Sequence, residues 1–443
     1  MGEMGERGLP DLARRRPAMT MRIAIVGSGI AGLAAARALA GPHAVTLYEA
    51  AARPGGHVYT VEANGLAVDL GFIVCNRERY PEFFRMLGEL RVATRPTTMS
   101  FSVAIPAAAG DAGDGLEWGS ASLGAVFADR RRLFDPRHWR FLAEVLAFVR
   151  RARRDLEGGL AARVSLDEYL THRRISREVR DRFVVPLAAA LWSLAPDRCG
   201  AFPAQTFLGF LDQHGMLRPI RPLAWHTIVG GSRCYVDALL ARLQETGRFT
   251  LELATPVERV ARDAGGVTLM AGGREHRYDR IILATHADTA LALLARPSEA
   301  ERRVLGAFRY SENRTVLHTD RRFLPRRPAA HASWNYVADP DTSQVAVTYS
   351  MTRLQGLPDA PYLVTLNPRT RPANVLHEVG FRHPQFDGAA LAAQSELPEL
   401  GRRHRTSYAG AYFGFGFHED GMRAGLGAAA RVTADEHRPA EAP

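Results

Sequence analysis

The stretch RIAIVGSGIAGLAAARALA, residues 22–40, places a short apolar strand directly before a G-x-G-x-x-G run. The pattern predicts a helix over residues 30–40 and a second strand over residues 45–49, which ends in Glu49. Strand, glycines, helix, strand and acid in this order predict a dinucleotide-binding βαβ unit. The alternative is a glycine-rich loop that binds nothing, but it does not explain why these parts follow one another.

Each glycine of the run has its own physical role. Gly27 permits the tight turn, Gly29 lets a pyrophosphate approach the backbone, and Gly32 lets helix and strand pack closely. The helix N-terminus supplies free N–H groups and positive potential to the phosphates. Glu49 can accept hydrogen bonds from the hydroxyls of a ribose. The chain is therefore predicted to bind FAD or NAD.

The residues after Glu49 favour FAD. Together with Arg53, Gly55 and Gly56, this acid forms an E-x-x-x-R-x-G-G stretch. The stretch resembles flavoproteins of the amine oxidase, protoporphyrinogen oxidase and phytoene desaturase superfamily. The resemblance implies an α/β fold, with a discontinuous Rossmann-like FAD-binding domain of the glutathione-reductase type and an α+β substrate domain. It also implies that the paired glycines run against the ribityl and pyrophosphate groups, which Arg53 helps to position.

Further matches to this superfamily follow in the same chain order. They are residues 69–72, 225–232, 255–257, 280–285, 408–410 and 415–422. The resemblance implies that residues 69–72 meet the flavin ring, that Val257 meets the adenine end, and that a helix N-terminus within the stretch 415–422 points at the flavin pyrimidine. The implied cofactor-binding residues are Gly27, Ser28, Gly29, Ile30, Ala31, Gly32, Glu49, Ala50, Arg53, Gly55, Gly56, His57, Val58, Gly71, Phe72, Val257, Ala284, Thr285, Gly410, Asp420, Gly421 and Met422.

A narrower resemblance rests on residues 334–336, 362–368 and 416–421. They are similar to a bacterial branch of predicted NAD/FAD-binding proteins, which are often encoded beside cyclopropane-fatty-acid synthases. This resemblance implies a lipid as substrate and a lipid-modifying methyltransferase as partner.

Lysine and cysteine usage limits the chemistry. The 443 residues include no lysine, so all 57 basic side chains are arginines, and neither a Schiff base nor a lysine general base is available. Many flavin amine oxidases use a lysine near the flavin, so its absence weakens that interpretation. The three cysteines, Cys75, Cys199 and Cys234, are unclustered and fit a reducing compartment. The stretch that resembles the closing flavin motif has no cysteine, so we expect non-covalent FAD.

The charge of +10 suggests an anionic partner. The arginines are dispersed and accompany no nucleic-acid-binding motif, so we expect no nucleic acid. An anionic membrane is the better candidate for peripheral contact, through a basic amphipathic helix over residues 130–154. Its apolar residues are Trp139, Phe141, Leu142, Val145, Leu146, Phe148 and Val149. The alternative is an ordinary helix that roofs the substrate cavity and has a solvated basic face.

The expected location is the cytoplasm, with the periphery of the inner membrane as the alternative. A signal peptide cleaved after residue 40 would remove the glycine run, so the arginines at 14–16 are not taken as a targeting signal. The expected organisation is a disordered tail over 1–20, an FAD-binding domain over 21–95, 222–290 and 400–435, a substrate domain over 96–221 and 291–399, and a second tail over 436–443.

Few side-chain catalysts are expected, because a flavin itself performs hydride transfer. His57 is the candidate for a proton-handling group, with packing or cofactor contact as the alternative. The candidate substrate-binding residues are Asn76, Arg77, Trp334, Tyr336 and Tyr349. No metal site is predicted, since the sequence has no H-E-x-x-H or C-x-x-C motif.

These features predict an FAD-dependent oxidoreductase that dehydrogenates a bulky apolar substrate, with a lipid acyl chain or isoprenoid preferred. Oxidation of an amine is the second hypothesis. The third is a flavin-binding partner of a lipid-modifying methyltransferase, without turnover of its own.

Overall fold

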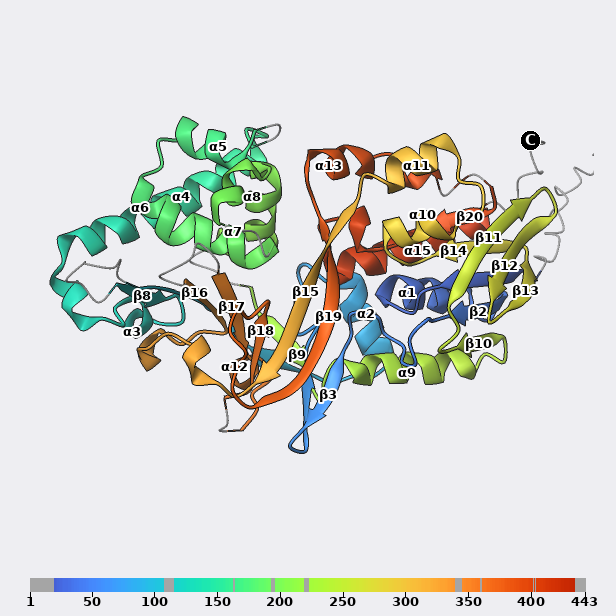
Figure 1. The fold of residues 1–443 in the computed structure, drawn as a ribbon, viewed down its shortest axis with the longest axis horizontal. Coiled ribbons are helices and arrows are strands. Elements are labelled where there is room, and N and C mark those ends of the chain that lie inside the picture. Colours follow the sequence, from blue (N-terminus) through green and yellow to red (C-terminus); the bar gives the residue numbers. More distant parts are fainter. Residues whose placement is uncertain are drawn as a thin grey trace, which may run out of the picture.

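Two lobes lie side by side in the computed structural model, each built around its own sheet (Figure 1). The structure describes residues 20–106, 115–161, 164–192, 196–218, 223–338, 345–358, 361–400, 402 and 404–434. The predicted tails 1–20 and 436–443 lie outside these residues, apart from Thr20. We call the lobes the parallel-sheet lobe and the mixed-sheet lobe.

The parallel-sheet lobe contains a five-stranded sheet in which every pair of neighbours is parallel. Its strands, in spatial order, are β10 (Phe249–Glu252), β2 (Ala44–Tyr48), β1 (Arg22–Val26), β14 (Arg280–Leu283) and β20 (Thr406–Tyr408). They come from the beginning, the middle and the end of the chain. The sheet therefore forms only when segments far apart in the sequence meet.

Both faces of this sheet are covered, which explains why β1 reads as a continuous apolar run. Ile23 and Ile25 point into a core shared with helices α1 (Ile30–Leu39), α2 (Pro81–Glu89), α9 (Arg233–Gln244) and α15 (His418–Ala434). Ala24 and Val26 point into a second core on the opposite face. That core includes the sheet β11 (Val257–Asp263), β12 (Gly266–Ala271) and β13 (Arg274–Tyr278), and helices α10 (Ala287–Leu293), α11 (Glu299–Leu305), α13 (Gly388–Gln394) and α14 (Leu397–Leu400).

Helix α15 packs unusually closely on α1, because glycines face that helix. A Cβ on Gly421 would lie 2.8 Å from Cγ2 of Ile30, and a Cβ on Gly425 would lie 2.1 Å from the carbonyl oxygen of Ala31. Side chains at these positions would separate the two helices. The end of the chain is thus held against the helix that follows the glycine run.

The mixed-sheet lobe contains a seven-stranded sheet. Its strands, in spatial order, are β19 (Val375–Gln385), β15 (Arg309–His318), β18 (Leu363–Leu366), β17 (Val345–Ser350), β16 (Trp334–Ala338), β7 (Phe101–Ile105) and β8 (Leu116–Gly119). The lobe's helices are α3 (Leu123–Val126), α4 (Pro136–Glu157), α5 (Leu166–His172), α6 (Arg177–Val179), α7 (Val185–Trp192), α8 (Ala204–Gln213) and α12 (Met351–Leu354). Helices α4 to α8 lie over one face of the sheet (Figure 1). The two lobes and their sheets confirm the predicted fold class.

Two smaller sheets lie beside the lobes. One is the hairpin β3 (Thr60–Ala63) and β4 (Leu66–Asp69), and the other joins β5 (Cys75–Asn76), β9 (Trp225–Ile228) and β6 (Thr94–Thr97). Among the helices that the structure describes, none has both the length and the apolar character needed to cross a bilayer.

The structure shifts one predicted domain boundary. Residues 291–399 were expected in the substrate domain, but α11, α13 and α14 bury their apolar faces against the parallel sheet. The contacts that assign these helices to the parallel-sheet lobe join residues far apart in the sequence. Local sequence patterns therefore did not reveal them.

Candidate active site

A cavity of about 700 Å³ opens between the two lobes. Both lobes line it, and many of the predicted site residues meet there. These are Gly27, Gly29, Ile30, Ala31, Glu49, Arg53, Gly55, Gly56, His57, Gly71, Phe72, Ala284, Thr285, Gly410, Trp334 and Tyr349. Its volume lies within the usual range of ligand and cofactor pockets.

The glycine run forms one end of this cavity. Gly27 has a φ of +101°, and a Cβ there would lie 2.7 Å from the carbonyl oxygen of Ala284. A Cβ on Gly32 would lie 1.9 Å from the carbonyl oxygen of Gly27, so this glycine permits close packing. A Cβ on Gly29 would meet no protein atom within 4 Å. Gly29 thus leaves open space beside the N-terminus of α1, where backbone N–H groups can hold a pyrophosphate.

Glu49 lies beside the glycine run, at the end of β2. Its Oε2 accepts hydrogen bonds from the backbone N and the Oγ of Ser28, at 3.0 and 2.5 Å, and its Oε1 accepts one from Ala51 N at 2.9 Å. Thr255 N donates to the carbonyl of Glu49 at 2.9 Å, which holds the chain before Val257 near this acid. The carboxylate is thus fixed at the cavity wall, where it can accept hydrogen bonds from ribose hydroxyls.

Arg53 organises the paired glycines. Its guanidinium donates to the carbonyls of Val58 and Gly56, at 2.9 and 3.1 Å, and lies 3.9 Å from the ring centroid of Tyr59. Gly55 adopts a φ of +108°, in the left-handed region that favours glycine. Arg53 therefore holds the loop in shape by binding the carbonyl groups of Gly56 and Val58.

The stretch around Gly71 packs directly against His57. A Cβ on Gly71 would lie 1.9 Å from the carbonyl oxygen of His57, which also accepts a hydrogen bond from Phe72 N at 3.0 Å. The Phe72 ring stacks on His418, with 3.8 Å between centroids. The beginning of α15 is thereby placed at the cavity, since His418 is its first residue.

Other predicted cofactor residues lie outside the cavity lining and support it. They are Ser28, Gly32, Ala50, Val58, Val257, Asp420, Gly421 and Met422. Ser28 Oγ accepts a hydrogen bond from Gly55 N at 3.0 Å. Asp420 Oδ2 accepts from the backbone N of Phe415 and Phe417, at 2.9 and 3.0 Å, so it shapes the preceding loop.

Three predicted substrate residues are placed away from the cavity. Asn76 is buried, and its Oδ1 accepts a hydrogen bond from Arg79 N at 2.9 Å, which shapes a turn. The Arg77 guanidinium lies 4.7 Å from the ring centroid of Phe84. Tyr336 belongs to the apolar core under the helices. These three side chains therefore contact other parts of the protein and do not line the cavity.

Several lining residues were missed by the sequence analysis, and one group of them comes from β15 and β19. Residues 380–385 of β19 all line the cavity, so both faces of this strand contribute. Asn313 and Thr315, two residues apart on β15, line the cavity as well. The period-two pattern of a strand does not single out these residues, because the part of each strand that meets the cavity depends on how the sheet is placed.

A cluster of imidazoles marks the middle of the site. The ring centroid of His57 lies 5.5 Å from that of His383, 5.8 Å from that of His286 and 5.2 Å from that of Phe381. His57 Nε2 lies 3.1 Å from the carbonyl oxygen of Arg382. Because a carbonyl only accepts, Nε2 carries the proton, and Nδ1 of neutral His57 remains able to accept one.

Burial keeps these imidazoles neutral. It lowers the pKa of His286 to about 4, that of His383 to about 4 and that of His418 to about 3, and it also lowers the pKa of His57. Nearby imidazoles add to the effect, since His57 disfavours a second positive charge on each of the other three. At neutral pH the four rings are therefore uncharged, and burial opposes a lasting positive charge on any of them.

The histidines predict that stability falls in mild acid. Groups with a lowered pKa in the folded state bind fewer protons there than in the unfolded chain, so the free energy of unfolding drops as the pH falls from about 6.5 to 4. We expect a loss on the order of several kcal/mol over this range. Asp69 opposes it in part, because burial raises the pKa of this acid to about 6. Denaturant titrations at several pH values measure how the free energy of unfolding changes with pH.

His418→Phe is the variant that checks this assignment. It retains a ring against Phe72 and removes one buried base, so its stability should depend less steeply on pH. His172→Phe, at an exposed position of α5, should behave like the wild type. A wild-type stability that stays constant between pH 6.5 and 4.5 contradicts the prediction.

FAD fits the residues of this site. The open space at Gly29, the bare N-terminus of α1 and the fixed carboxylate of Glu49 suit its pyrophosphate and ribose. When bound, FAD supplies a ring that accepts a hydride. Among the described residues, no group of three or more His, Cys, Asp or Glu side chains is arranged to hold a metal ion.

Comparison with known proteins supports this interpretation. The family model for flavin containing amine oxidoreductases matches residues 30–371. Cyclohexylamine oxidase from Brevibacterium oxydans is 17% identical with a TM-score of 0.67, and the match covers 95% of this chain and 100% of that one. A fatty acid isomerase from P. acnes is 16% identical with a TM-score of 0.65, and the match covers 93% and 98% of the two chains.

A third similar structure is putrescine oxidase bound to putrescine, at 16% identity and a TM-score of 0.63, with 94% and 100% of the two chains covered. No curated protein matches the sequence significantly. These likenesses confirm the predicted superfamily, and the family match extends over most of the chain. The chain belongs to the flavin containing amine oxidoreductases and is an FAD-dependent oxidoreductase.

Proposed function

We propose that this enzyme dehydrogenates a bulky, largely apolar substrate, with a lipid acyl chain or an isoprenoid preferred. The observation that carries the proposal is the apolar wall of the cavity in the mixed-sheet lobe. It is formed by Phe210, Trp334, Tyr349, Leu354, Leu366 and Phe381. Such a wall stabilises a long hydrocarbon by removing its surface from water.

The charges of the cavity also favour a substrate without a positive charge. Among the described lining residues, Glu49 is the only carboxylate, and it lies at the end with the glycine run. The other charged lining side chains are the guanidinium groups of Arg53 and Arg382. A protonated amine would therefore enter a site that lacks a nearby counter-charge, at a cost in desolvation.

The hydroxyl of a buried threonine in the cavity wall offers a polar contact. Thr315 is fully buried, it lines the cavity, and its Oγ1 has no hydrogen-bond partner among the residues that the structure describes. A buried polar atom without a partner costs about 1–3 kcal/mol, so a polar group of the substrate would restore the missing bond. Dehydrogenation also releases a proton, which neutral His57 can relay through Nδ1 but, with its lowered pKa, does not retain.

Two other functions have their own support. Amine oxidation is supported by the family and by the likeness to cyclohexylamine oxidase and putrescine oxidase. The likeness to a fatty acid isomerase supports the lipid substrate. A role as flavin-binding partner of a lipid-modifying methyltransferase rests on the narrower sequence resemblance alone.

Anaerobic reduction of the bound flavin separates these functions. Purified holoenzyme is mixed with oleic acid, geranylgeraniol, cyclohexylamine or putrescine, and the flavin absorbance is followed. Bleaching by a lipid supports the proposal, and bleaching by an amine alone overturns it. No bleaching by any lipid, together with a tight complex with the methyltransferase, would favour the third function.

Leu366→Asp gives opposite results for the two classes of substrate. A carboxylate in the apolar wall repels a hydrocarbon chain and attracts a protonated amine. We expect the apparent affinity for the lipid to fall at least ~tenfold, since the cost of an unpaired buried charge exceeds 1.4 kcal/mol. Leu376→Asp, at an exposed leucine outside the lining, is the matched control. Unchanged lipid kinetics in Leu366→Asp would place the substrate elsewhere.

A further inference from the structure

Exposed apolar side chains gather at one end of the mixed-sheet lobe. Among the described residues, eight large hydrophobic side chains are exposed, and six of them lie between residues 123 and 160. Four form what we call the apolar tip, with exposed fractions of 81% for Leu123, 41% for Leu133, 88% for Phe134 and 52% for Trp139. Exposed apolar residues concentrated in this way mark an interaction surface.

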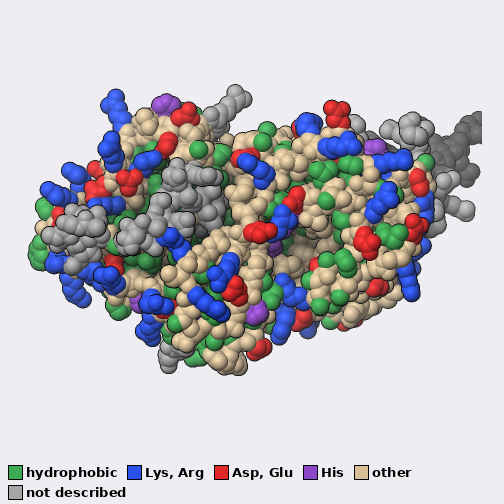
Figure 2. All heavy atoms as spheres, viewed as in Figure 1, with side chains coloured by type: hydrophobic (Ala, Val, Ile, Leu, Met, Phe, Trp, Pro, Cys, Tyr) green, Lys and Arg blue, Asp and Glu red, His purple; other side chains and the backbone are tan. Residues whose placement is uncertain are grey.

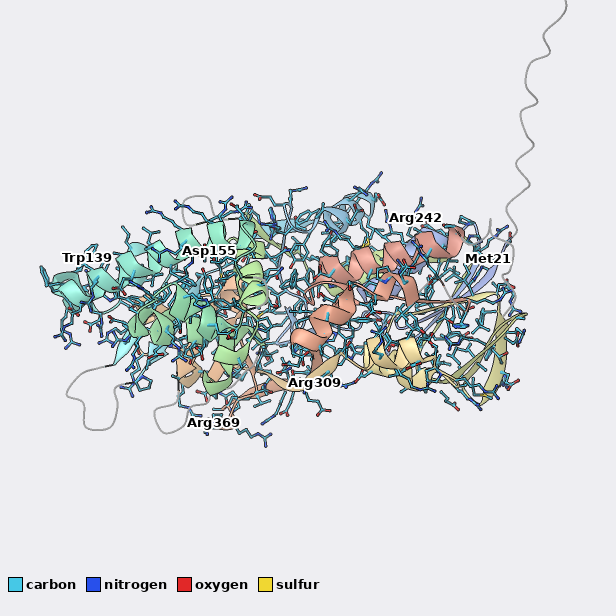
Figure 3. The ribbon with its side chains drawn as sticks, turned by 90° about the horizontal axis from the view of Figure 1, so that it is seen from above. Met21, Trp139, Asp155, Arg242, Arg309 and Arg369 are labelled. Carbon is cyan, nitrogen blue, oxygen red and sulfur yellow. The ribbon has the colours of Figure 1, made fainter. Side chains whose placement is uncertain are left out.

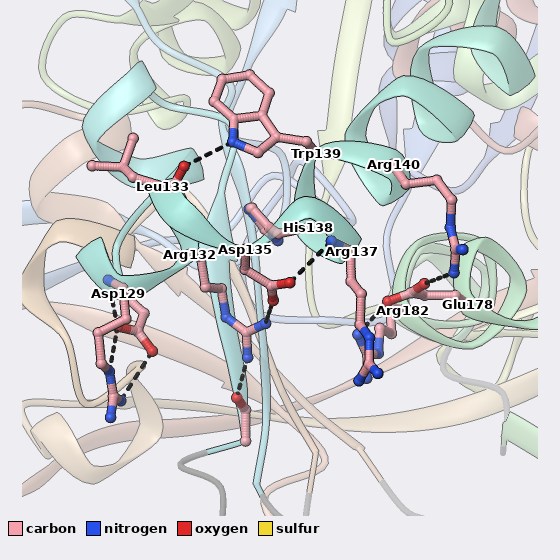
Figure 4. A network of polar contacts seen from close by, with 12 residues as sticks. Asp129, Arg132, Leu133, Asp135, Arg137, His138, Trp139, Arg140, Glu178 and Arg182 are labelled. Atoms are coloured by element: carbon pink, nitrogen blue, oxygen red, sulfur yellow. Dashed lines mark hydrogen bonds and ion pairs between the residues drawn. The ribbon is translucent and has the colours of Figure 1, made fainter.

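Polar contacts within the segment hold the tip in place (Figure 4). Asp129 accepts a hydrogen bond from Arg131 N at 3.2 Å, and Asp135 accepts one from Arg137 N at 2.9 Å, so each acid caps a helical turn. Trp139 Nε1 donates to the carbonyl of Leu133 at 2.9 Å. The polar atom of the indole is thus satisfied within the protein, which leaves the exposed part of the ring apolar.

Helix α4 carries the apolar surface onward from the tip. Its residues Phe141, Phe148 and Val149 are buried in the core, whereas Trp139 and Leu146 are exposed two turns apart on the outer side. Figure 3 shows α4 along the outside of the lobe, with Trp139 near its far end. No described residue of α4 lines the cavity, so this helix does not form the roof that was the alternative expectation.

Positive charge surrounds this surface. Residues 123–182 contain 15 arginines and 9 acidic residues, and this excess is more than half of the chain's net charge of +10. Arg131 and Arg140 remain 70% and 67% exposed even though both lie near carboxylates. Arginine side chains are visible around this end of the molecule, on the left in Figure 2.

We propose that the apolar tip docks this enzyme on the surface of an anionic lipid bilayer. Leucine, phenylalanine and tryptophan side chains enter the region between headgroups and acyl chains, while the neighbouring arginines meet the lipid phosphates. This interaction is independent of the proposed substrate, because neither the tip nor α4 reaches the cavity.

The charge also argues against a second copy of the chain as the occupant. Two tips brought together would place arginines of both copies opposite one another, and like charges across an interface oppose association. A bilayer with anionic headgroups neutralises the same arginines and accepts the four apolar side chains. An anionic bilayer therefore accounts for both the exposed apolar side chains and the arginines around them.

Vesicle flotation with the full-length holoenzyme tests the proposal. We expect the wild type to float with phosphatidylcholine vesicles that contain phosphatidylglycerol, and to bind vesicles of phosphatidylcholine alone far less. Flotation should decrease as salt is added. Phe134→Ser combined with Trp139→Ser should weaken binding at least ~tenfold. The matched control is Val229→Ser combined with Leu376→Ser, which alters two exposed apolar residues elsewhere and should float like the wild type.

The flavin absorbance of each variant shows that it is folded, so loss of flotation can be assigned to the surface. A wild type that does not float with anionic vesicles overturns the proposal, as does a tip variant that floats like the wild type. Light scattering tests whether a second copy of the chain covers the tip instead. A wild-type dimer that the tip substitutions dissociate would overturn the proposal and make this surface a contact between copies.

Discussion

Gly29→Val is expected to give a folded protein that has lost its FAD. A Cβ at this position meets no protein atom within 4 Å, and the backbone has a φ of −63°, which valine tolerates. The added side chain therefore leaves the protein core undisturbed and occupies the space beside the N-terminus of α1. A pyrophosphate cannot approach the backbone once that space is filled. We expect colourless protein and at least ~100-fold weaker binding on reconstitution, which corresponds to about 2.8 kcal/mol.

The matched control is Gly88→Val, at an exposed glycine of α2 that also has open space around its Cα. This variant should remain yellow, because it costs only helix propensity. Absorbance of the purified proteins measures flavin occupancy, and titration of the apoprotein with FAD measures the dissociation constant. Full flavin occupancy in Gly29→Val would show that the glycine run does not bind the cofactor.

Asp69→Ala is expected to have the largest effect on stability. The carboxylate is fully buried and accepts hydrogen bonds from Ser232 N and Oγ, at 2.9 and 2.7 Å, from Thr60 Oγ1 at 2.5 Å and from Gln355 Nε2 at 3.1 Å. These partners come from three separate parts of the chain. Removing the acceptor leaves several buried donors unpaired, so we expect a loss of about 3–5 kcal/mol in the free energy of unfolding.

Asp263→Ala provides the comparison, since Asp263 is an exposed acid whose partner is the equally exposed Arg277. Its stability should stay close to that of the wild type. Denaturant unfolding followed by circular dichroism measures both variants. An Asp69→Ala protein as stable as the control would mean that Asp69 does not join the three segments.

The cofactor end of the site was predictable because its rules are local. Residues 22–49 encode a strand, a turn, a helix and a second strand within a few tens of residues, and Gly32 is required by the nearby carbonyl oxygen of Gly27. Arg53 and the paired glycines come only a few residues after Glu49 in the sequence, so they could be recognised as part of the same motif. The motif can therefore be recognised locally, although β14, β10 and the chain around Ala284 complete this end of the site.

The substrate end could not be predicted in the same way. Asn76, Arg77 and Tyr336 have side chains suited to a binding site, yet they are used in a turn, a ring contact and a core. His286 and His383 join His57 although they are separated from it by more than two hundred residues of chain. The pKa values of these histidines are lowered by burial, and the burial arises only when the three segments pack together.

The sequence by itself determined the nucleotide-binding unit, the superfamily and the absence of lysine chemistry, because motifs and composition are properties of the chain. Only the tertiary structure decided which strand faces line the cavity, which histidines stay neutral and which apolar residues of 123–160 remain exposed. Burial, lowered pKa values and exposed surface arise from contacts between distant segments, and these contacts exist only once the two lobes have formed.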